Sequence, residues 1–236
     1  MKKYEETYRR WLNEPTLDGE IKAELAKLGK REEDVYEAFY RDLEFGTAGL
    51  LGIMGPGTNR MNVAVIRRVT QGIANYLNHL SETPSVAISY DSRNNSRRFA
   101  ENAASVLAAN GIRVWIFQQM MPVPALSFVT RHLNCAMGIM ITASHNPKEY
   151  NGYKVYGPDG GQILADAANA ILAEIDQVDY FEGPKSMPFE KALEGRCRYI
   201  SEQVENDYLQ AVQTLSTGQD LSDLKLVYSP LNGAGL

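Results

Sequence analysis

The sequence is poor in the residues and segments that mark several classes of protein. Its 236 residues include two cysteines, Cys135 and Cys197, which form neither a disulfide framework nor a zinc site of the usual spacing. Cys135 begins an apolar run and is expected to be a buried, reduced thiol. No segment approaches the roughly 20 apolar residues that cross a bilayer, and the N-terminus lacks a secretory signal. We therefore expect a cytoplasmic protein with no membrane partner.

The charge balance argues against a further class. The formal net charge is -5, whereas nucleic acids are bound chiefly through lysine and arginine, so no nucleic acid partner is expected. A small phosphorylated ligand is compatible with this charge, because a few local donors outweigh a modest overall field. Hydrophobic residues make up 44% of the chain, which is ordinary for a globular protein with a core.

Residues 1–42 are expected to form a helical N-terminal extension. Tyr4, Tyr8 and Trp11 recur at helical spacing. Pro15 and Gly29 stand where the first two helices would end. Aromatic stripes of this kind are usually packing surface, so the extension is expected to brace the domain that follows.

Residues 43–198 alternate between strand and helix patterns. Short apolar strands are expected at Val86–Tyr90, Ile112–Phe117 and Ala136–Thr142. Amphipathic helices lie between them, which predicts an α/β fold, a layered sheet with helices on both faces. Chemistry in such folds gathers in the loops after the carboxyl ends of the strands. The loops at Asp91–Asn95, Gln118–Pro122 and Ala143–Asn151 are therefore expected to meet at one rim of the sheet.

Residues 199–236 are expected to be the incomplete start of a second α/β domain. A helix is expected from Ser201 to Leu215, then a strand at Leu224–Tyr228 and a turn at Asn232–Gly235. A strand and turn without a covering helix leave an open edge. We expect either that the chain is part of a longer polypeptide or that a partner covers this unit. Self-association, in which a second copy of the chain is that partner, is one form of the second alternative.

The loop after the third strand carries the residues best suited to chemistry. Ser144 directly follows a buried strand, His145 is next to it, and Asn146-Pro147 favours a turn that presents both. A serine hydroxyl becomes a nucleophile only with help from a base, a cation or an anion-binding environment. Neighbouring side chains of an extended chain point in opposite directions, so adjacency does not establish a Ser–His pair. A plain serine turn remains the alternative.

The surroundings of this loop favour phosphate chemistry. Lys154 places an ammonium group a few residues later, and Gly46 and Gly49 allow the backbone to approach a phosphate closely. Arg93, at a neighbouring strand end, suits either gripping phosphate or orienting the loop. A single arginine in such a place is more often a structural ion-pair partner.

Several segments resemble the α-D-phosphohexomutase superfamily in the order in which that family carries them. Gly138–Tyr156 resembles its phosphoserine loop, and Phe45–Leu50 resembles its N-terminal signature. Gly57–Asn62 is similar to the branch with bacterial phosphoglucomutases and phosphopentomutase-like enzymes. Met121–Leu126 resembles the segment before the third strand, and Leu226–Gly235 the opening of the second domain. The resemblance implies phosphohexomutase domain I over residues 43–198.

The resemblance also implies roles for single residues. Ser144 corresponds to the serine that is phosphorylated in the resting enzyme, and His145 to the histidine beside it. Lys154 corresponds to a general acid or base for the sugar hydroxyl. The implied substrate- or phosphate-binding residues are Arg93, Thr47, Gly49 and Asn146.

The implied activity is that of a phosphoglucomutase or phosphomannomutase. Phosphoserine donates its phosphoryl group to a hexose phosphate, and the bisphosphate so formed returns its other phosphate. The implied cofactor is Mg²⁺, held partly through the phosphate of Ser144, and the implied activator is glucose 1,6-bisphosphate. Glucose phosphate is the preferred substrate, ahead of mannose or pentose phosphates.

Two departures from the family keep a second hypothesis open. Leu51 stands where the family usually has arginine, and loss of a catalytic cation costs about 2–4 kcal/mol of transition-state stabilisation. The family's Asp-x-Asp-x-Asp magnesium loop is also absent from this sequence, and Asp91 and Asp159 do not have its spacing. The alternative to a mutase is a non-catalytic paralogue that binds phosphorylated ligands or partner subunits.

Overall fold

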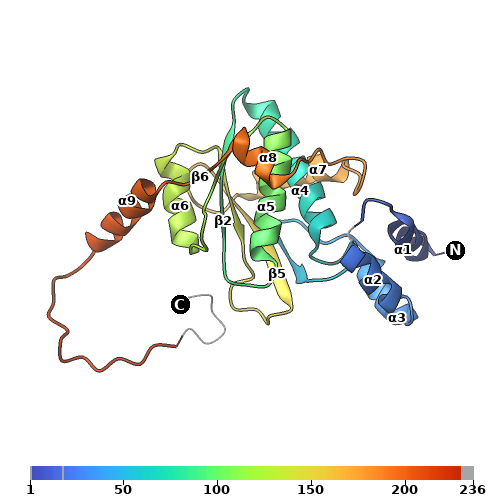
Figure 1. Cartoon of the computed structure of the whole chain (residues 1–236), viewed down its shortest axis with the longest axis horizontal. Coiled ribbons are helices and arrows are strands. Elements are labelled where there is room, and N and C mark those ends of the chain that lie inside the picture. Colours follow the sequence, from blue (N-terminus) through green and yellow to red (C-terminus); the bar gives the residue numbers. More distant parts are fainter. Residues whose placement is uncertain (1, 18, 230–236) are drawn as a thin grey trace.

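A single mixed sheet organises the chain, as the computed structural model shows for residues 2–17 and 19–229 (Figure 1). Its six strands follow the order β1-β5-β4-β2-β3-β6. They are β1 (Leu50–Ile53), β2 (Ser85–Tyr90), β3 (Arg113–Ile116), β4 (Met137–Ile141), β5 (Tyr150–Tyr156) and β6 (Cys197–Tyr199). Strands β4, β2, β3 and β6 are parallel to one another, β5 is antiparallel to β4, and the edge strand β1 is antiparallel to β5.

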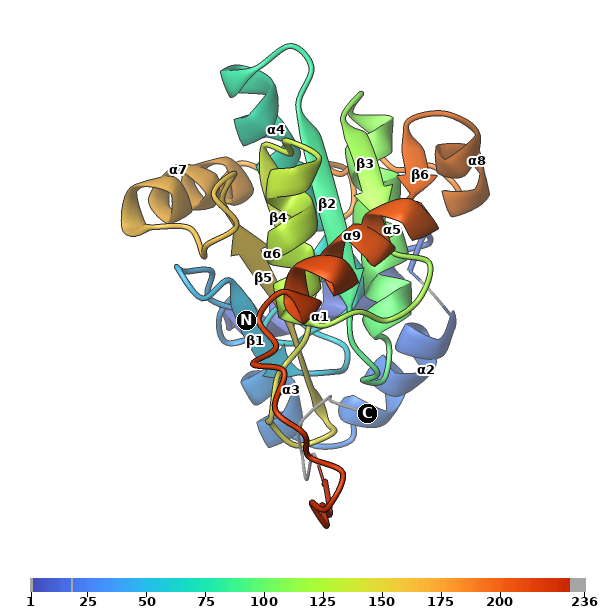
Figure 2. The same cartoon turned by 90° about the vertical axis from the view of Figure 1, so that its left-hand side faces the viewer.

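Helices cover both faces of this sheet, which confirms the expected α/β class (Figure 2). The helices in the described residues are α1 (Lys3–Asn13), α2 (Gly19–Leu28), α3 (Glu32–Phe39), α4 (Val63–Leu80), α5 (Ser96–Ala109), α6 (Val123–His132), α7 (Ala165–Asp176), α8 (Phe189–Glu194) and α9 (Glu202–Gln213). One face is covered by α4 and α5, with α7 against α4 and α8 against α5. The other face is covered by α6, against which α9 packs. None of the helices within residues 2–17 and 19–229 has the length and apolar character that a membrane crossing needs.

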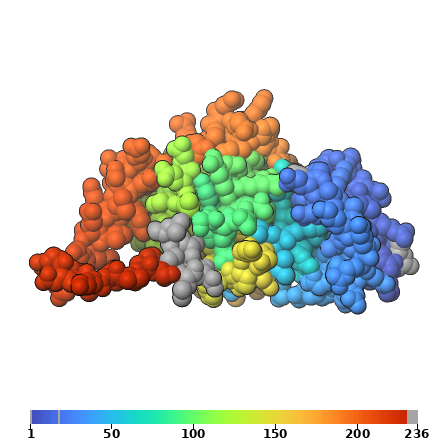
Figure 3. All heavy atoms as spheres, turned by 60° about the horizontal axis from the view of Figure 1, so that its bottom comes forward, coloured from blue at the N-terminus to red at the C-terminus, as the bar shows by residue number. Residues whose placement is uncertain are grey.

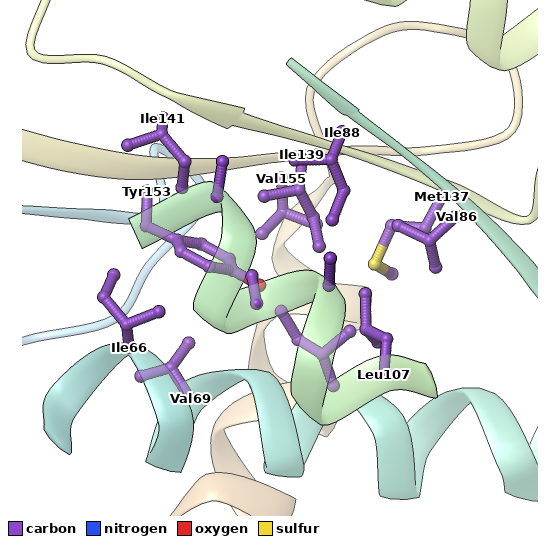
Figure 4. Close-up of a cluster of buried hydrophobic side chains, with 14 of the residues drawn as sticks. Ile66, Val69, Val86, Ile88, Leu107, Met137, Ile139, Ile141, Tyr153 and Val155 are labelled. Carbon is purple, nitrogen blue, oxygen red and sulfur yellow. The ribbon is translucent and has the colours of Figure 1, made fainter. Parts of the chain in front are cut away.

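The central strands β2 and β4 are buried on both faces, which explains why they are continuous apolar runs. Figure 4 shows Ile66 and Val69 of α4 facing the sheet, with the ring of Tyr153 between them and the strands. The Tyr153 hydroxyl lies 3.1 Å from Thr70 Oγ1, so its polar end is paired inside the core. Burial raises the pKa of Tyr153, which keeps this phenol neutral at physiological pH.

The helical extension packs through its aromatic stripe. Trp11 is 1% exposed, and its ring lies edge-on to those of Phe39, Tyr180 and Phe181, at centroid distances of 5.2–5.6 Å. Tyr180 and Phe181 follow α7, so this contact joins the extension to the sheet domain. The aromatic pattern of α1 is therefore packing surface, as its spacing indicates.

Strand β1 was not among the predicted elements. It lies inside the glycine-rich segment, where only four residues alternate between buried and exposed positions. Leu50 pairs with Tyr153 and Ile53 with Tyr150 of β5. Such a short strand depends on its partner for its hydrogen bonds, so its local sequence carries a weak signal.

The sheet domain extends beyond the predicted boundary between residues 198 and 199. Strand β6 crosses that position and pairs with β3, and Ile200 is buried in the cluster under α6. Residues Phe181–Arg198, a segment with two glycines and two prolines, contain α8 and the start of β6. The predicted helix after Ser201 is present as α9, and it packs against α6.

The strand predicted at Leu224–Tyr228 is wrong, since these residues are exposed and form no strand. A short run with strand propensity forms a strand only where a neighbouring strand receives its hydrogen bonds, and no strand in the described residues pairs with this one. The predicted turn Asn232–Gly235 lies outside the described residues.

The contact between α4 and α7 predicts a sensitive glycine. A Cβ at Gly72 would lie 2.5 Å from Ile175 Cγ1 and 2.8 Å from Ile175 N. Gly72→Ala should lower the free energy of unfolding by about 1–3 kcal/mol, measured by urea denaturation. Gly19→Ala in α2 is the control, because a Cβ there meets nothing within 4 Å. Equal stability of the two variants would refute this packing.

Candidate active site

Ser144 stands in the loop between β4 and β5, at the carboxyl end of β4. Its backbone has φ of 56°, in the left-handed region that residues with a Cβ rarely adopt. The other described non-glycine residues with positive φ are Asn95 and Asn134, whose side chains tolerate it. Ser144 and His145 are exposed, and the yellow segment that contains this loop reaches the surface in Figure 3. The turn thus holds the serine hydroxyl outward at some conformational cost.

Arg93 holds this loop from the end of β2. Its Nη2 donates to the carbonyl oxygens of Ser144 at 2.6 Å and Asn146 at 2.5 Å. Its Nη1 donates to the carbonyls of Pro147 at 3.0 Å and Tyr150 at 3.3 Å. The outer nitrogens are thus occupied by loop backbone. Of the two roles predicted for Arg93, the geometry favours orienting the loop over gripping phosphate.

A buried carboxylate completes the support. Asp91 Oδ2 accepts a hydrogen bond from Thr142 Oγ1 at 2.6 Å, and Thr142 Oγ1 accepts one from Ser144 N at 2.9 Å. Asp91 Oδ1 accepts from Ser96 Oγ at 2.7 Å and from Arg93 N at 3.0 Å. The Asp91 carboxylate also forms an ion pair with Arg93 Nε at 3.6 Å. A buried charge needs such partners, and here they connect the end of β2 to the serine.

Asp91 and Thr142 were not predicted as site residues. In the sequence, Asp91 stands beside the more conspicuous guanidinium of Arg93, and Thr142 is the end of an apolar strand. One sequence feature does point to Asp91 and Thr142 as site residues. Each directly follows an apolar strand of the predicted sheet, at the edge where the loops of a parallel sheet converge. Their mutual contact depends on the pairing of Tyr90 with Ile141 across β2 and β4.

The left-handed turn brings Ser144 and His145 together. Ser144 Oγ lies 3.3 Å from His145 Nδ1, at the long end of hydrogen-bond range. On an extended backbone the two side chains would diverge, as the sequence alone implied. The structure thus pairs the hydroxyl with a group that can hold its proton.

Lys154 lies in β5, half-buried, opposite Met140. Met140 and Tyr156 belong to the cluster on the α6 side, so Lys154 faces that side and Tyr153 faces α4. Within the described residues the Lys154 ammonium has no hydrogen bond or ion pair. Lys154 therefore places an unpaired cation in β5, the strand that follows the Ser144 loop.

The glycine turn rests against Lys154. Gly46 N donates to Gly49 O at 3.2 Å, and Gly49 N donates to Gly46 O at 2.8 Å. Gly49 has φ of 78°, and a Cβ there would overlap the Tyr153 carbonyl and lie 2.9 Å from Lys154 Cα. The Gly49 N–H is therefore used inside the turn, and glycine is required for contact with β5. The turn leaves Thr47 exposed beside that strand.

Asn146 also acts within the loop. Its Nδ2 and its backbone N–H both lie 3.0 Å from the Ala143 carbonyl. The side-chain amide thus donates back to the carbonyl three residues earlier, which uses one of the donors predicted for phosphate. Gly49 and Asn146 thus shape the loop, and their role as direct phosphate ligands stays a prediction.

Leu51 lies on the same face as Lys154. It pairs with Gly152 of β5, and its Cδ1 would be 3.5 Å from a Cβ at Gly152. Gly152 O in turn accepts a hydrogen bond from Thr142 N at 3.0 Å. Leu51 is 48% exposed, so an apolar side chain faces solvent two strands away from Thr142. A cation at this position would stand beside the serine loop.

A magnesium site is not assembled by the part of the chain that the structure describes. It contains no group of three or more histidine, cysteine, aspartate or glutamate side chains that could hold a metal. The Asp91 carboxylate already accepts hydrogen bonds from Thr142 and Ser96 and forms an ion pair with Arg93. The described side chains by themselves therefore do not form a complete Mg²⁺ site.

Comparison with known proteins agrees with this geometry. The profile described as "Phosphoglucomutase/phosphomannomutase, alpha/beta/alpha domain I" matches residues 42–182. A phosphoglucomutase from Staphylococcus saprophyticus is 39% identical over 206 residues, which is 87% of this chain and 37% of that protein. A phosphoglucomutase from Staphylococcus aureus strain USA300 is 39% identical over 201 residues, 85% of this chain and 36% of the relative. The chain thus spans little more than a third of the curated relatives it matches.

Solved structures show the same fold. A Thermus thermophilus protein assigned as a phosphomannomutase is similar with a TM-score of 0.61 and 29% identity, over 74% of this chain and 36% of that one. Parafusin, a phosphoglucomutase from Paramecium in its open form, is similar in fold with a TM-score of 0.58 and 23% identity, over 75% of this chain and 36% of that one. The profile covers more than half of the chain at the segments that build the Ser144 site. The chain belongs to the phosphoglucomutase/phosphomannomutase family and contains its α/β/α domain I.

Proposed function

We propose that this chain provides the phosphoryl-carrying serine of a phosphosugar mutase that interconverts hexose 1-phosphate and hexose 6-phosphate. The observation that carries the proposal is the exposed Ser144 hydroxyl, held outward on a left-handed turn and paired with His145. A loop fixed in this way presents a nucleophile with little reorganisation. Membership of the family supplies the substrate class, a phosphosugar, with glucose phosphate preferred.

The proposed reaction has two balanced phosphoryl transfers. In the first, the bond between phosphorus and Ser144 Oγ breaks while a sugar hydroxyl oxygen bonds to phosphorus, and the hydroxyl proton passes to a base. Lys154, when uncharged, is the proposed base. In the second, the other phosphate of the bisphosphate moves to Ser144 Oγ and the proton returns to the released sugar oxygen. His145 is proposed to give a proton to Ser144 Oγ as that oxygen leaves phosphorus in the first transfer, and to take the proton back when Oγ attacks in the second.

Family membership supports further parts of the proposal. We propose Mg²⁺ as the cofactor, with an oxygen of the Ser144 phosphate among its ligands, and glucose 1,6-bisphosphate as the activator. When bound, Mg²⁺ would offset charge on the transferring oxygens. We also propose a cytoplasmic location, because the phosphoglucomutases that the chain resembles are metabolic enzymes.

Leu51 favours a second candidate function. An exposed leucine gives no stabilisation to a dianionic phosphoryl group, unlike the arginine that the family usually has there. A non-catalytic relative would keep the shape of the loop and bind phosphorylated ligands or partner subunits without turnover. Phosphorylation of Ser144 separates the two functions.

Covalent phosphorylation is the first test. Intact-mass spectrometry of the chain after incubation with glucose 1,6-bisphosphate and Mg²⁺ should show the gain of one phosphate. Ser144→Ala should abolish that gain, whereas Ser92→Ala, at an exposed serine of the neighbouring loop, should leave it unchanged. A wild-type chain without phosphate, or a phosphorylated Ser144→Ala chain, would reject the mutase proposal.

The Arg93 clamp predicts a rate effect without a binding effect. A lysine ammonium cannot reach four carbonyls at once, so Arg93→Lys should slow phosphorylation of Ser144 by about 10- to 100-fold. The bisphosphate concentration that gives half the maximal rate should stay within about threefold. Arg97→Lys, at an exposed arginine paired with Glu101, is the control. A higher half-maximal concentration with an unchanged maximal rate would place Arg93 on the phosphate instead.

An arginine in place of Leu51 tests whether position 51 faces the transferring phosphate. Leu51→Arg should raise the rate of Ser144 phosphorylation by at least about tenfold, because a guanidinium would stand on the exposed face beside Lys154. Leu80→Arg is the control, since Leu80 is 65% exposed at the end of α4, just before the start of β2 and at the end of the sheet opposite Ser144. Equal rates for the two variants would show that position 51 does not face the transferring phosphate.

A further inference from the structure

A cluster of arginines lies at the opposite end of the sheet from Ser144. Arg113 is the first residue of β3, and Arg196 and Arg198 flank Cys197 at the start of β6. Ser144 follows the carboxyl end of β4, and these strands are parallel, so the two regions occupy opposite ends. Figure 2 shows β3 and β6 side by side next to α8. The cluster therefore stands apart from the proposed catalytic loop.

The three guanidinium groups share one hollow. Arg113, Arg196, Arg198, Trp115 and Gly195 line a space of about 520 Å³. Trp115 pairs with Arg198 across the two strands, and its half-buried indole is an apolar part of the lining. A hollow of this size is in the range of small-molecule sites, which is roughly 300–1,000 Å³.

The charge in this hollow is not neutralised by the rest of the described chain. No carboxylate lines it, and none forms an ion pair or hydrogen bond with the three side chains among residues 2–17 and 19–229. Glu194, the nearest acidic residue in the sequence, makes no such contact either. The whole chain has a net charge of -5, so three adjacent unpaired cations are a local exception. Like charges on neighbouring strands repel each other, and a bound anion would relieve that repulsion.

We infer that the hollow lined by Arg113, Arg196, Arg198 and Trp115 binds a small molecule that carries phosphate groups. All three cations are arginines, whose planar fork binds phosphate oxygens in pairs, and none is a lysine. The indole provides a wall for the uncharged part of the ligand. Nucleic acid would need an extended basic tract, which this compact cluster does not form.

The two tryptophans of the chain allow a local test. Trp11 is 1% exposed, so collisional quenchers reach only Trp115. Iodide should quench the fluorescence more strongly than caesium, because the guanidinium groups concentrate anions. At constant ionic strength, pyrophosphate should lower the iodide quenching constant by about twofold or more, by occupying the hollow.

Variants decide whether the arginines are responsible. Replacing Arg113, Arg196 and Arg198 by glutamine together should weaken pyrophosphate binding at least about tenfold by calorimetry and remove the preference for iodide. Arg198→Gln alone should weaken pyrophosphate binding by a smaller factor. This single variant replaces the triple variant in the test if the triple variant does not fold. Arg9→Gln, at an exposed arginine of α1, should bind like the wild type.

Two outcomes would overturn the inference. One is equal protection of Trp115 by pyrophosphate in the wild type and the triple variant. The other is protection by polyglutamate but not by pyrophosphate, which would identify a docking surface for an acidic protein segment. Neither outcome depends on phosphorylation of Ser144, so this inference and the mutase proposal fail separately.

Discussion

The ion pair between Asp91 and Arg93 is the interaction on which the site depends. Both side chains are nearly excluded from solvent, with 5% and 9% of their surfaces exposed. Charges so placed need hydrogen-bond partners, and the Ser144 loop supplies most of them, while Arg93 Nε has only the ion pair with Asp91. Four carbonyls accept from the guanidinium, and Thr142 donates to the carboxylate. The need to satisfy a buried ion pair thereby fixes a strained serine turn.

The hydrophobic core decides that these groups can meet. Asp91 and Thr142 follow β2 and β4 at the same level because Tyr90 pairs with Ile141. That register is held by apolar residues on both faces, from α4 and α5 on one side and α6 on the other. A slip of one residue would turn every buried side chain to the wrong face, so the core also sets the geometry of the polar loops.

The edge of the sheet links the extension to the same loop. Asn59 N donates to the Ala38 carbonyl and Asn59 Nδ2 to the Glu37 carbonyl, which ties α3 to the segment after β1. Met54 N, at the end of β1, donates to the Glu149 carbonyl in the Ser144 loop at 2.8 Å. The extension thus contacts the site through a few backbone hydrogen bonds and braces it from the side opposite Arg93.

The sequence by itself determined the elements whose signal is local. Apolar runs predicted β2, β3 and β4, helical spacing predicted the long helices, and the segments around Ser144 and Gly46 carried the resemblance to the family that comparison then showed. Tertiary structure alone decided which groups meet. It brings four loop carbonyls to Arg93 and places β5 so close to Gly49 that glycine is required there. Pairing with a neighbour makes β1 and β6 strands, whereas Leu224–Tyr228 has no partner strand among the described residues and forms no strand. The reason is physical. Backbone propensity and periodicity act over a few residues, whereas ion pairs, strand pairing and steric contacts depend on residues brought together from distant parts of the chain.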